Sequence, residues 1–248
     1  MAEPEQPSTA RMIDFWLGGE HHYPVDVAAA RAFEEAYGPC AAIFRDLRAF
    51  LGRAVTAIAD AGVDGFLVLG AGLPTRGNVH EVATAANVLY TDVDPVTVRL
   101  GQQILADSDR AGYGYGDATD IGTVDRAQLH RFVPGWGRRP VGVVFLGLAA
   151  FLDDATLART LEEIYEAVAP GSFLAFDFDS EELAGYPQAL AMMGPQFRMR
   201  DPASFGPLLG RWAPTGDGIV AVSRWRVDGE PAAVPDAFHG GLAVKPTG

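Results

Sequence analysis

The sequence predicts an α/β fold whose mostly parallel sheet follows a helical N-terminal segment. From residue 63 onward, short apolar runs alternate with stretches of helical periodicity, which is typical of parallel strands joined by crossover helices. Several of these runs end directly at glycine or aspartate, as buried strands do where they lead into a turn. Hydrophobic residues make up 48% and charged residues 21% of the 248 positions, so the composition is that of an ordinary globular chain.

Two helices are expected before residue 63. The first, residues 25–37, is Ala-rich and ends at Gly38-Pro39. The second, residues 41–60, carries one apolar face and ends just before Gly62. Farther upstream, Gly18-Gly19 interrupts the helical spacing. The apolar positions that define the two faces are Val25, Ala29 and Phe33 in the first helix, and Phe44, Leu47, Leu51, Val55 and Ile58 in the second.

The remaining elements follow from apolar runs and the residues that bound them. Short apolar runs between glycines, prolines or acidic residues predict buried strands, and the amphipathic stretches between them predict helices. In chain order, the predicted strands are 65–69, 87–91, 112–116, 140–147 and 172–178, and the predicted helices are 78–86, 95–107 and about 153–168. Two later runs, 220–225 and 241–244, predict an antiparallel pair at the sheet edge.

Composition excludes several classes of protein. The net charge of -13 argues against nucleic-acid binding, which depends on a surface rich in lysine and arginine. The single cysteine, Cys40, rules out an intrachain disulfide and a site of several thiolates, and we expect it to be a small buried residue. The first residues lack the features of a signal peptide, and no run of ~18 apolar residues is long enough to span a membrane. We therefore expect a cytoplasmic protein without nucleic-acid or membrane partners.

The motif with the clearest chemistry is the turn Gly70-Ala71-Gly72, directly after the first predicted strand. Glycine lets the backbone approach a ligand closely, and ligands of open α/β sheets bind beyond the carboxyl ends of the strands. Asp92 ends the next strand, 20 residues after Gly72, where a carboxylate accepts hydrogen bonds from both ribose hydroxyls. Asp117 follows the third strand, where it can accept one from an adenine amino group. Taken singly, each aspartate is as compatible with a helix cap or a solvated loop.

The turn lacks the third glycine of a dinucleotide-binding fingerprint. Pro74 also removes one backbone N–H where a pyrophosphate requires exposed amides at a helix start. The pattern therefore argues against NAD or FAD and favours a nucleoside without phosphates.

Longer motifs carry a family resemblance. GLPTRGNVHEVA (72–83), YTDVDP (90–95) and ARMIDFWLGGEHHY (10–23) resemble motifs of a bacterial family of S-adenosylmethionine-dependent methyltransferases that was long known only as a domain of unknown function. The resemblance covers nearly the whole chain. It implies a Rossmann-like class I methyltransferase fold, with a seven-stranded sheet and an N-terminal helical cap. Residues 1–62 would form the cap and residues 63–248 the domain that binds S-adenosylmethionine.

The resemblance also implies a cofactor site. The glycine turn would back the methionine part of the cofactor, Asp92 would hold the ribose, and Val93 and the 117–118 pair would surround the adenine. Thr75 would shape the loop, and Leu146 would line the pocket floor next to Gly147. The cofactor-binding residues implied in this way are Gly70, Ala71, Gly72, Thr75, Asp92, Val93, Asp117, Ala118 and Leu146, and no metal site is expected.

Three departures from the family pattern fall at the expected site. Val68 stands where the family has an acidic residue that helps to hold the methionine amino group, an interaction of ~1.5–3 kcal/mol. The family's G-G-K-D-N segment is Gly18-Gly19-Glu20-His21-His22 here, so its last three residues have changed. Ala149-Ala150-Phe151 stands where the family has L-H-F and lacks its histidine. A retained fold with a reshaped active site is the expected consequence.

Methyl transfer needs an aligned acceptor and, for a hydroxyl or amine, removal of a proton. His21 and His22 are the predicted bases, and Asp14 and Tyr23 flank them; the alternative is a pair of polar loop histidines. The favoured function is methyl transfer to oxygen or nitrogen of a small metabolite. The alternatives are a repurposed enzyme that catalyses a cyclisation or isomerisation in secondary metabolism, and a non-catalytic binding protein.

Overall fold

A central sheet organises the molecule. The computed structural model describes residues 4–231 and 233–247. In this part of the chain the sheet has eight strands in the order β3-β2-β1-β4-β5-β8-β6, and β7 also pairs with β8. The strands are β1 (Gly65–Leu69), β2 (Asn87–Asp92), β3 (Ala111–Tyr115), β4 (Gly142–Phe145), β5 (Phe173–Asp179), β6 (Ala213–Pro214), β7 (Val220–Ala221) and β8 (Phe238–Val244). β1 to β5 are parallel, and β8 is antiparallel to β5.

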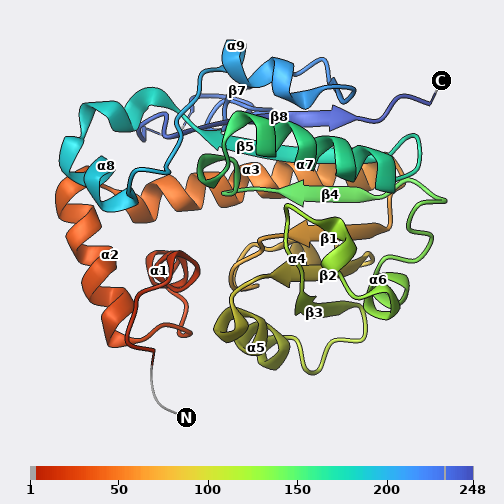
Figure 1. Cartoon of the computed structure of the whole chain (residues 1–248), viewed down its shortest axis with the longest axis horizontal. Helices are drawn as coiled ribbons and strands as arrows, with labels where there is room; N and C mark the ends of the chain where they lie inside the picture. The colour runs from red at the N-terminus through yellow and green to blue at the C-terminus, as the bar shows by residue number, and fades with distance from the viewer. Residues whose placement is uncertain (1–3, 232, 248) are drawn as a thin grey trace.

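Helices cover both faces of this sheet (Figure 1). α3 lies behind it and α7 in front of it, and the parallel strands point toward the side on which α1 and α2 lie. The helices are α1 (Thr9–Trp16), α2 (Pro24–Tyr37), α3 (Cys40–Asp60), α4 (Val79–Val82), α5 (Pro95–Ile104), α6 (Arg126–Phe132), α7 (Asp154–Ala167), α8 (Pro187–Met193) and α9 (Pro202–Phe205). The predicted α/β fold with a mostly parallel sheet is confirmed. The strand count exceeds the expected seven because β6 and β7 are short edge segments of two residues each.

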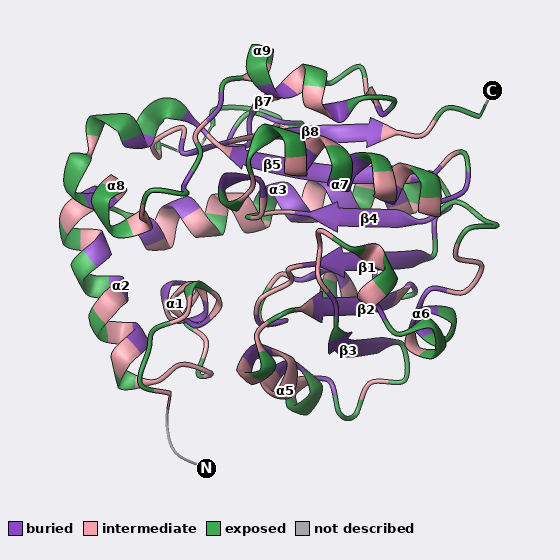
Figure 2. Ribbon diagram, viewed as in Figure 1, coloured by how far each residue is buried: buried purple, intermediate pink, exposed green. Residues whose placement is uncertain are grey.

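The central strands β1 and β4 are buried along their whole length (Figure 2), and their alternate residues face two separate cores. Phe66 and Val68 of β1 pack toward the core that contains the apolar face of α3, whereas Leu67 and Leu69 face the core that contains α7. All five residues of β1 are buried, which explains why the strand has a continuous apolar sequence. Each fully buried Leu or Phe contributes roughly 1.5–3 kcal/mol of transfer free energy to these cores.

Several predicted elements are shorter in the structure. The strand expected at 140–147 is β4, Gly142–Phe145, and the helix expected at 95–107 is α5, Pro95–Ile104. The helix expected at 78–86 contains only α4, Val79–Val82, because the chain must turn at Ala83–Ala86 to enter β2. The strand expected at 220–225 ends at Ala221, and the next residues form turns that place Trp225 against Phe50 with ring centroids 5.3 Å apart. Burial of the indole thus overrides the local strand pattern. The predicted antiparallel pairing of the two late segments is confirmed by β7 and β8.

The N-terminal helices do not stand apart from the sheet. Phe50, Leu51, Val55 and Ile58 of α3 belong to the same core as β1 and β2. The division into a cap (1–62) and a cofactor domain (63–248) therefore stays a prediction about domains. Cys40 is buried in the first turn of α3, as expected, and burial raises the pKa of its thiol to about 12. No helix of the described residues is long and apolar enough to cross a membrane.

Candidate functional site

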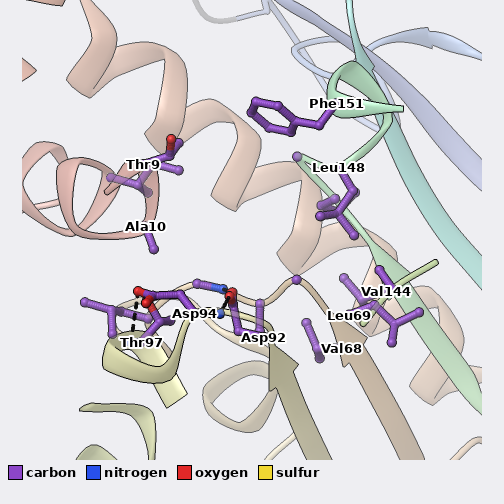
Figure 3. A pocket seen from close by; sticks show the side chains of 18 of the residues that line it. Thr9, Ala10, Val68, Leu69, Asp92, Asp94, Thr97, Val144, Leu148 and Phe151 are labelled. Carbon is purple, nitrogen blue, oxygen red and sulfur yellow. Dashed lines mark hydrogen bonds between the residues drawn. The ribbon is translucent and has the colours of Figure 1, made fainter. Parts of the chain in front are cut away.

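A cavity of about 500 Å³ opens at the carboxyl ends of the parallel strands. Loops after β1 to β4 and residues of α1 and α3 line it, and Figure 3 shows side chains from both sides pointing into it. All of the predicted cofactor residues are among those that line the cavity, namely Gly70, Ala71, Gly72, Thr75, Asp92, Val93, Asp117, Ala118 and Leu146. The position agrees with the rule that ligands of such sheets bind beyond the strand ends.

The turn after β1 requires glycine for two separate reasons. Gly70 and Gly72 have φ angles of 54° and 60°, which side chains rarely adopt. A Cβ atom on Gly70 would also lie 2.3 Å from Leu148 Cδ2, so Leu148 packs directly on this backbone. The turn thus presents bare backbone to the cavity.

Asp92 is held in position by this turn. Its Oδ2 accepts a hydrogen bond from Gly72 N at 3.0 Å and its Oδ1 accepts one from Asp94 N at 3.0 Å (Figure 3). Burial raises the pKa of the Asp92 carboxyl. The cap of α5 is Asp94, which accepts from the backbone N–H groups of Val96 and Thr97, so the alternative role of Asp92 as a helix cap does not apply.

Asp117 combines the two roles considered for it. The residue lines the cavity, yet its Oδ1 accepts hydrogen bonds from Thr119 N at 2.8 Å and Thr119 Oγ1 at 2.7 Å. The carboxylate thus stabilises its own loop. Its second oxygen has no protein partner among the described residues.

Arg48 is a cavity residue that sequence reasoning missed. Its Nη1 donates to Asn78 Oδ1 at 3.0 Å, and no carboxylate of the described chain forms a salt bridge with it. Burial lowers the pKa of the guanidinium, which is the signature of a cation removed from water. The signal in the sequence is its position on the apolar face of α3, between Phe44 and Leu51 at helical spacing.

The predicted catalytic segment folds around Asp14. Asp14 lines the cavity and is buried; Thr75 Oγ1 donates to its Oδ1 at 2.9 Å, and His21 N donates to its Oδ2 at 2.7 Å. His22 Nδ1 lies 3.0 Å from the same Oδ2. A Cβ atom on Gly19 would lie 2.0 Å from Asp14 Oδ1, so the loop closes tightly over this carboxylate.

The other members of this segment lie behind Asp14. His21, His22 and Tyr23 are not among the residues that line the cavity. The ring of His22 packs edge-on against Phe15 at 5.3 Å, and the ring of Tyr23 lies 5.6 Å from the guanidinium of Arg11. The structure therefore brings Asp14 to the cavity and connects His22 to it only through Asp14. The catalytic roles of these residues stay predictions.

A second acidic position, Asp179 at the end of β5, also lines the cavity and was not predicted. Asp177, two residues earlier, shares its face of the strand. Asp177 Oδ1 accepts from Gly147 N at 2.6 Å, and its Oδ2 is buried without a partner. Burial raises the pKa of Asp177 to about 7. The pKa of Asp179 is raised well above its usual value by burial and by the neighbouring carboxyl of Asp177. In the sequence, the ending Asp177-Phe178-Asp179 of the fifth predicted strand was the signal that could have indicated these two acidic positions.

The Ala149-Ala150-Phe151 departure lies in a segment that borders the cavity. These residues form a short 3-10 turn whose carbonyls bind two arginines: Arg200 Nη1 donates to Ala149 O at 2.8 Å and Arg198 N donates to Ala150 O at 2.8 Å. Phe151 lines the cavity (Figure 3). In the described residues, no group of three or more His, Cys, Asp or Glu side chains is arranged to hold a metal ion.

Comparison with known proteins shows which family the chain matches. A family model described as S-adenosyl methyltransferase matches residues 2–246. No curated protein sequence matches the chain.

Several solved structures are similar to this chain over most of its length. A DUF574 family protein from Streptomyces avermitilis superposes with a TM-score of 0.86 at 28% identity, covering 98% of each chain. A candidate methyltransferase from Thermobifida fusca superposes with a TM-score of 0.85 at 25% identity, covering 97% of this chain and 96% of that one. Human N-acetylserotonin methyltransferase in complex with SAM is similar in fold, with a TM-score of 0.52 at 14% identity over 94% of this chain and 62% of that one.

Proposed function

We propose a small-molecule acceptor for this chain, which belongs to the S-adenosyl methyltransferase family and uses S-adenosylmethionine as its methyl donor. The observation that carries the proposal is the cavity at the strand ends. Helices α1 and α3 and the strand-end loops enclose it, and it is the size of a small-molecule site. The net charge of -13 disfavours a nucleic-acid acceptor.

The residues present fit the cofactor. Neither Gly70 nor Gly72 places a side chain in the cavity, and Leu148 packs over Gly70. Asp92 is oriented by Gly72 N, and each of its carboxylate oxygens keeps a lone pair for a ribose hydroxyl. Arg48 is a half-buried cation without a carboxylate partner at salt-bridge distance in the described chain, which suits the carboxylate of the methionine part. Val68 contributes only apolar contact where the family has an acid.

The chemistry requires alignment more than covalent help from the protein. When bound, S-adenosylmethionine would supply an electrophilic methyl group on a sulfonium, whose sulfur would keep the electron pair of the bond to the transferred carbon. The chain contributes orientation and exclusion of water, since residues of α1 cover the cavity and aromatic side chains such as Phe151 line it. Asp14, with His22 behind it, is one candidate route for a proton.

Arg48 provides the test of this cofactor placement. We expect Arg48→Met to weaken binding of S-adenosylhomocysteine by about 10- to 100-fold, because a charge-assisted hydrogen bond to a carboxylate is lost. Binding of 5′-methylthioadenosine, which lacks the amino-acid part, should stay unchanged. Titration calorimetry of both ligands measures the difference.

The matched control is Arg45→Met, which removes an exposed arginine from the same helix and should change neither affinity. Equal loss of both ligands in Arg48→Met would show that the variant damages the cavity as a whole. Failure of the unaltered protein to bind S-adenosylhomocysteine at millimolar concentration would contradict the proposed function itself.

The residue at position 68 favours a second candidate function. Val68 removes the usual partner of the methionine amino group, as expected for a repurposed enzyme that catalyses a cyclisation or isomerisation without methyl transfer. The same titration separates the two, because such an enzyme has no need of tight cofactor binding. Micromolar affinity for S-adenosylhomocysteine supports methyl transfer.

A further inference from the structure

The cavity contains five acidic residues, and one of them differs from the others in its hydrogen bonding. Asp14, Asp92, Asp94 and Asp117 each accept hydrogen bonds from neighbouring backbone or side-chain donors. Among the described residues, no donor binds the carboxylate of Asp179. Arg200, the cation whose charge acts on Asp179, directs its guanidinium to Asp154 and to the carbonyls of Ala149 and Leu152 instead.

The sheet order separates Asp179 from the predicted nucleoside residues. Asp92 ends β2 and Asp179 ends β5, with β1 and β4 between them. At a strand spacing of about 4.8 Å, the two strand ends lie on the order of 14 Å apart. Asp179 therefore lies at the opposite end of the cavity from Asp92, where the nucleoside is proposed to bind.

Apolar and aromatic side chains surround this end. Phe44 and Phe238 approach to 5.7 Å between ring centroids, and Phe151 and Phe197 approach to 6.1 Å. These four rings and Met193 line the cavity together with Asp179. Aromatic faces attract a cation and also bury the apolar body of a ligand.

We infer that Asp179 binds the amino group of the methyl acceptor, and that the acceptor is an amine on an apolar, ring-containing body. The inference rests on the proposed function. In the step assigned to Asp179, its carboxylate takes one proton from the substrate ammonium and becomes the neutral acid. The ammonium becomes a neutral amine whose lone pair is then free to attack.

Electrostatics around Asp179 favour this role. The groups that face it are Asp177 on its own strand, Arg200 and, from α2, Tyr37. Burial and the neighbouring carboxyl of Asp177 together raise the pKa of Asp179, which makes the carboxylate a stronger proton acceptor than an exposed one. Asp179 is half-buried and its carboxylate has no hydrogen-bond partner among the described residues, so it is partly removed from water, and an incoming cation offsets the cost of that desolvation.

The test compares probes that share an aromatic body and differ in the charged group at its end. Tryptamine and indole-3-propionate are titrated into the protein saturated with S-adenosylhomocysteine, and 2-phenylethylamine and 3-phenylpropionate form a second pair. We expect each amine to bind at least about 10-fold more tightly than its carboxylate counterpart. Asp179→Asn, which is close in shape and uncharged, should reduce this preference to within about 3-fold.

Glu181→Gln is the matched control, because it removes an exposed carboxylate two residues farther along the chain and should keep the full preference. The inference is overturned if neither amine binds, if the unaltered protein shows no preference, or if Asp179→Asn retains it. Because binding of S-adenosylhomocysteine is measured first, failure of the proposed function is recognised before any amine is added. Circular dichroism confirms that Asp179→Asn is folded.

Discussion

At the scale of single residues, three charged side chains at the cavity are wholly or partly removed from water. Arg48, Asp177 and Asp179 all lie in or beside the cavity, and none has an oppositely charged partner at salt-bridge distance in the described chain. Burying such groups reduces stability unless a ligand or a proton neutralises them. We therefore expect the free energy of unfolding to depend on pH.

Asp177 gives the clearest prediction of that kind. Its pKa is raised to about 7 by burial, whereas an unfolded chain titrates near ~3.9. Between these values the folded state holds a proton that the unfolded state has lost, so stability is fullest below pH ~4 and falls as the pH rises toward 7. Asp177→Asn should flatten this fall by at least about 1 kcal/mol, measured by urea unfolding from pH 4.5 to 7.5.

The pH profile is the informative quantity because any fixed cost of the substitution cancels from it. Asp179 keeps its own raised pKa, so some slope should remain in the variant. Asp60→Asn, at an exposed position, should follow the unaltered protein. A profile of Asp177→Asn parallel to that of the unaltered protein would rule out a buried neutral Asp177.

At the scale of elements, aspartates connect the N-terminal helices to one another. Asp26 of α2 is fully buried; its Oδ1 accepts from Ser8 N at 2.9 Å, and its Oδ2 accepts from Tyr23 N at 2.9 Å and Arg11 Nε at 2.8 Å. One side chain thereby joins the start of α1 to the start of α2. Because α1 lines the cavity, this contact helps to shape the site.

Asp26→Asn should test that connection. The substitution leaves the guanidinium of Arg11 buried with only Asp94, at 3.6 Å, to balance it, so a loss of about 3 kcal/mol is expected. Because α1 lines the cavity, we also expect weaker binding of S-adenosylhomocysteine. Urea unfolding and calorimetry measure the two effects, and Glu35→Gln, exposed on the same helix, is the control. If Asp26→Asn binds S-adenosylhomocysteine as tightly as the unaltered protein, the contact of Asp26 with α1 does not shape the site.

At the scale of the whole molecule, side-chain contacts join the N-terminal helices to the loops of the sheet. Asp14 binds Thr75, and Arg48 binds Asn78, so both α1 and α3 are connected to the loop after β1. The cavity lies between these two parts of the chain. A ligand that fills it therefore contacts both parts and should stabilise the whole fold.

Thermal unfolding measures this stabilisation. At 100 times its dissociation constant, S-adenosylhomocysteine should add about 2.7 kcal/mol to the free energy of unfolding. For a chain of this length, that corresponds to a rise of roughly 5–10 °C in the unfolding midpoint. Asp92→Asn should give a smaller rise at the same ligand concentration. An unchanged midpoint with millimolar ligand would contradict binding to the folded state.

The sequence by itself determined the sheet and the position of the cavity. The strands that contribute most to the core are buried on both faces, so their continuous apolar runs are visible without a structure. The glycine turn is equally local, because Gly70 and Gly72 need positive φ angles that other residues avoid. Asp92 follows from its place at a strand end. For these features the physical cause lies within a few residues.

Only the tertiary structure decided which charged groups share the cavity. Arg48 and Asp179 are 131 positions apart in the sequence. The local signals, a place on the apolar face of α3 and the D-F-D ending of β5, do not indicate that the two side chains share one cavity. Their importance comes from what packs around them and from the partners they lack, which long-range packing alone determines. The turn at Trp225 has the same origin, since burial against Phe50 outweighs the local preference for a strand.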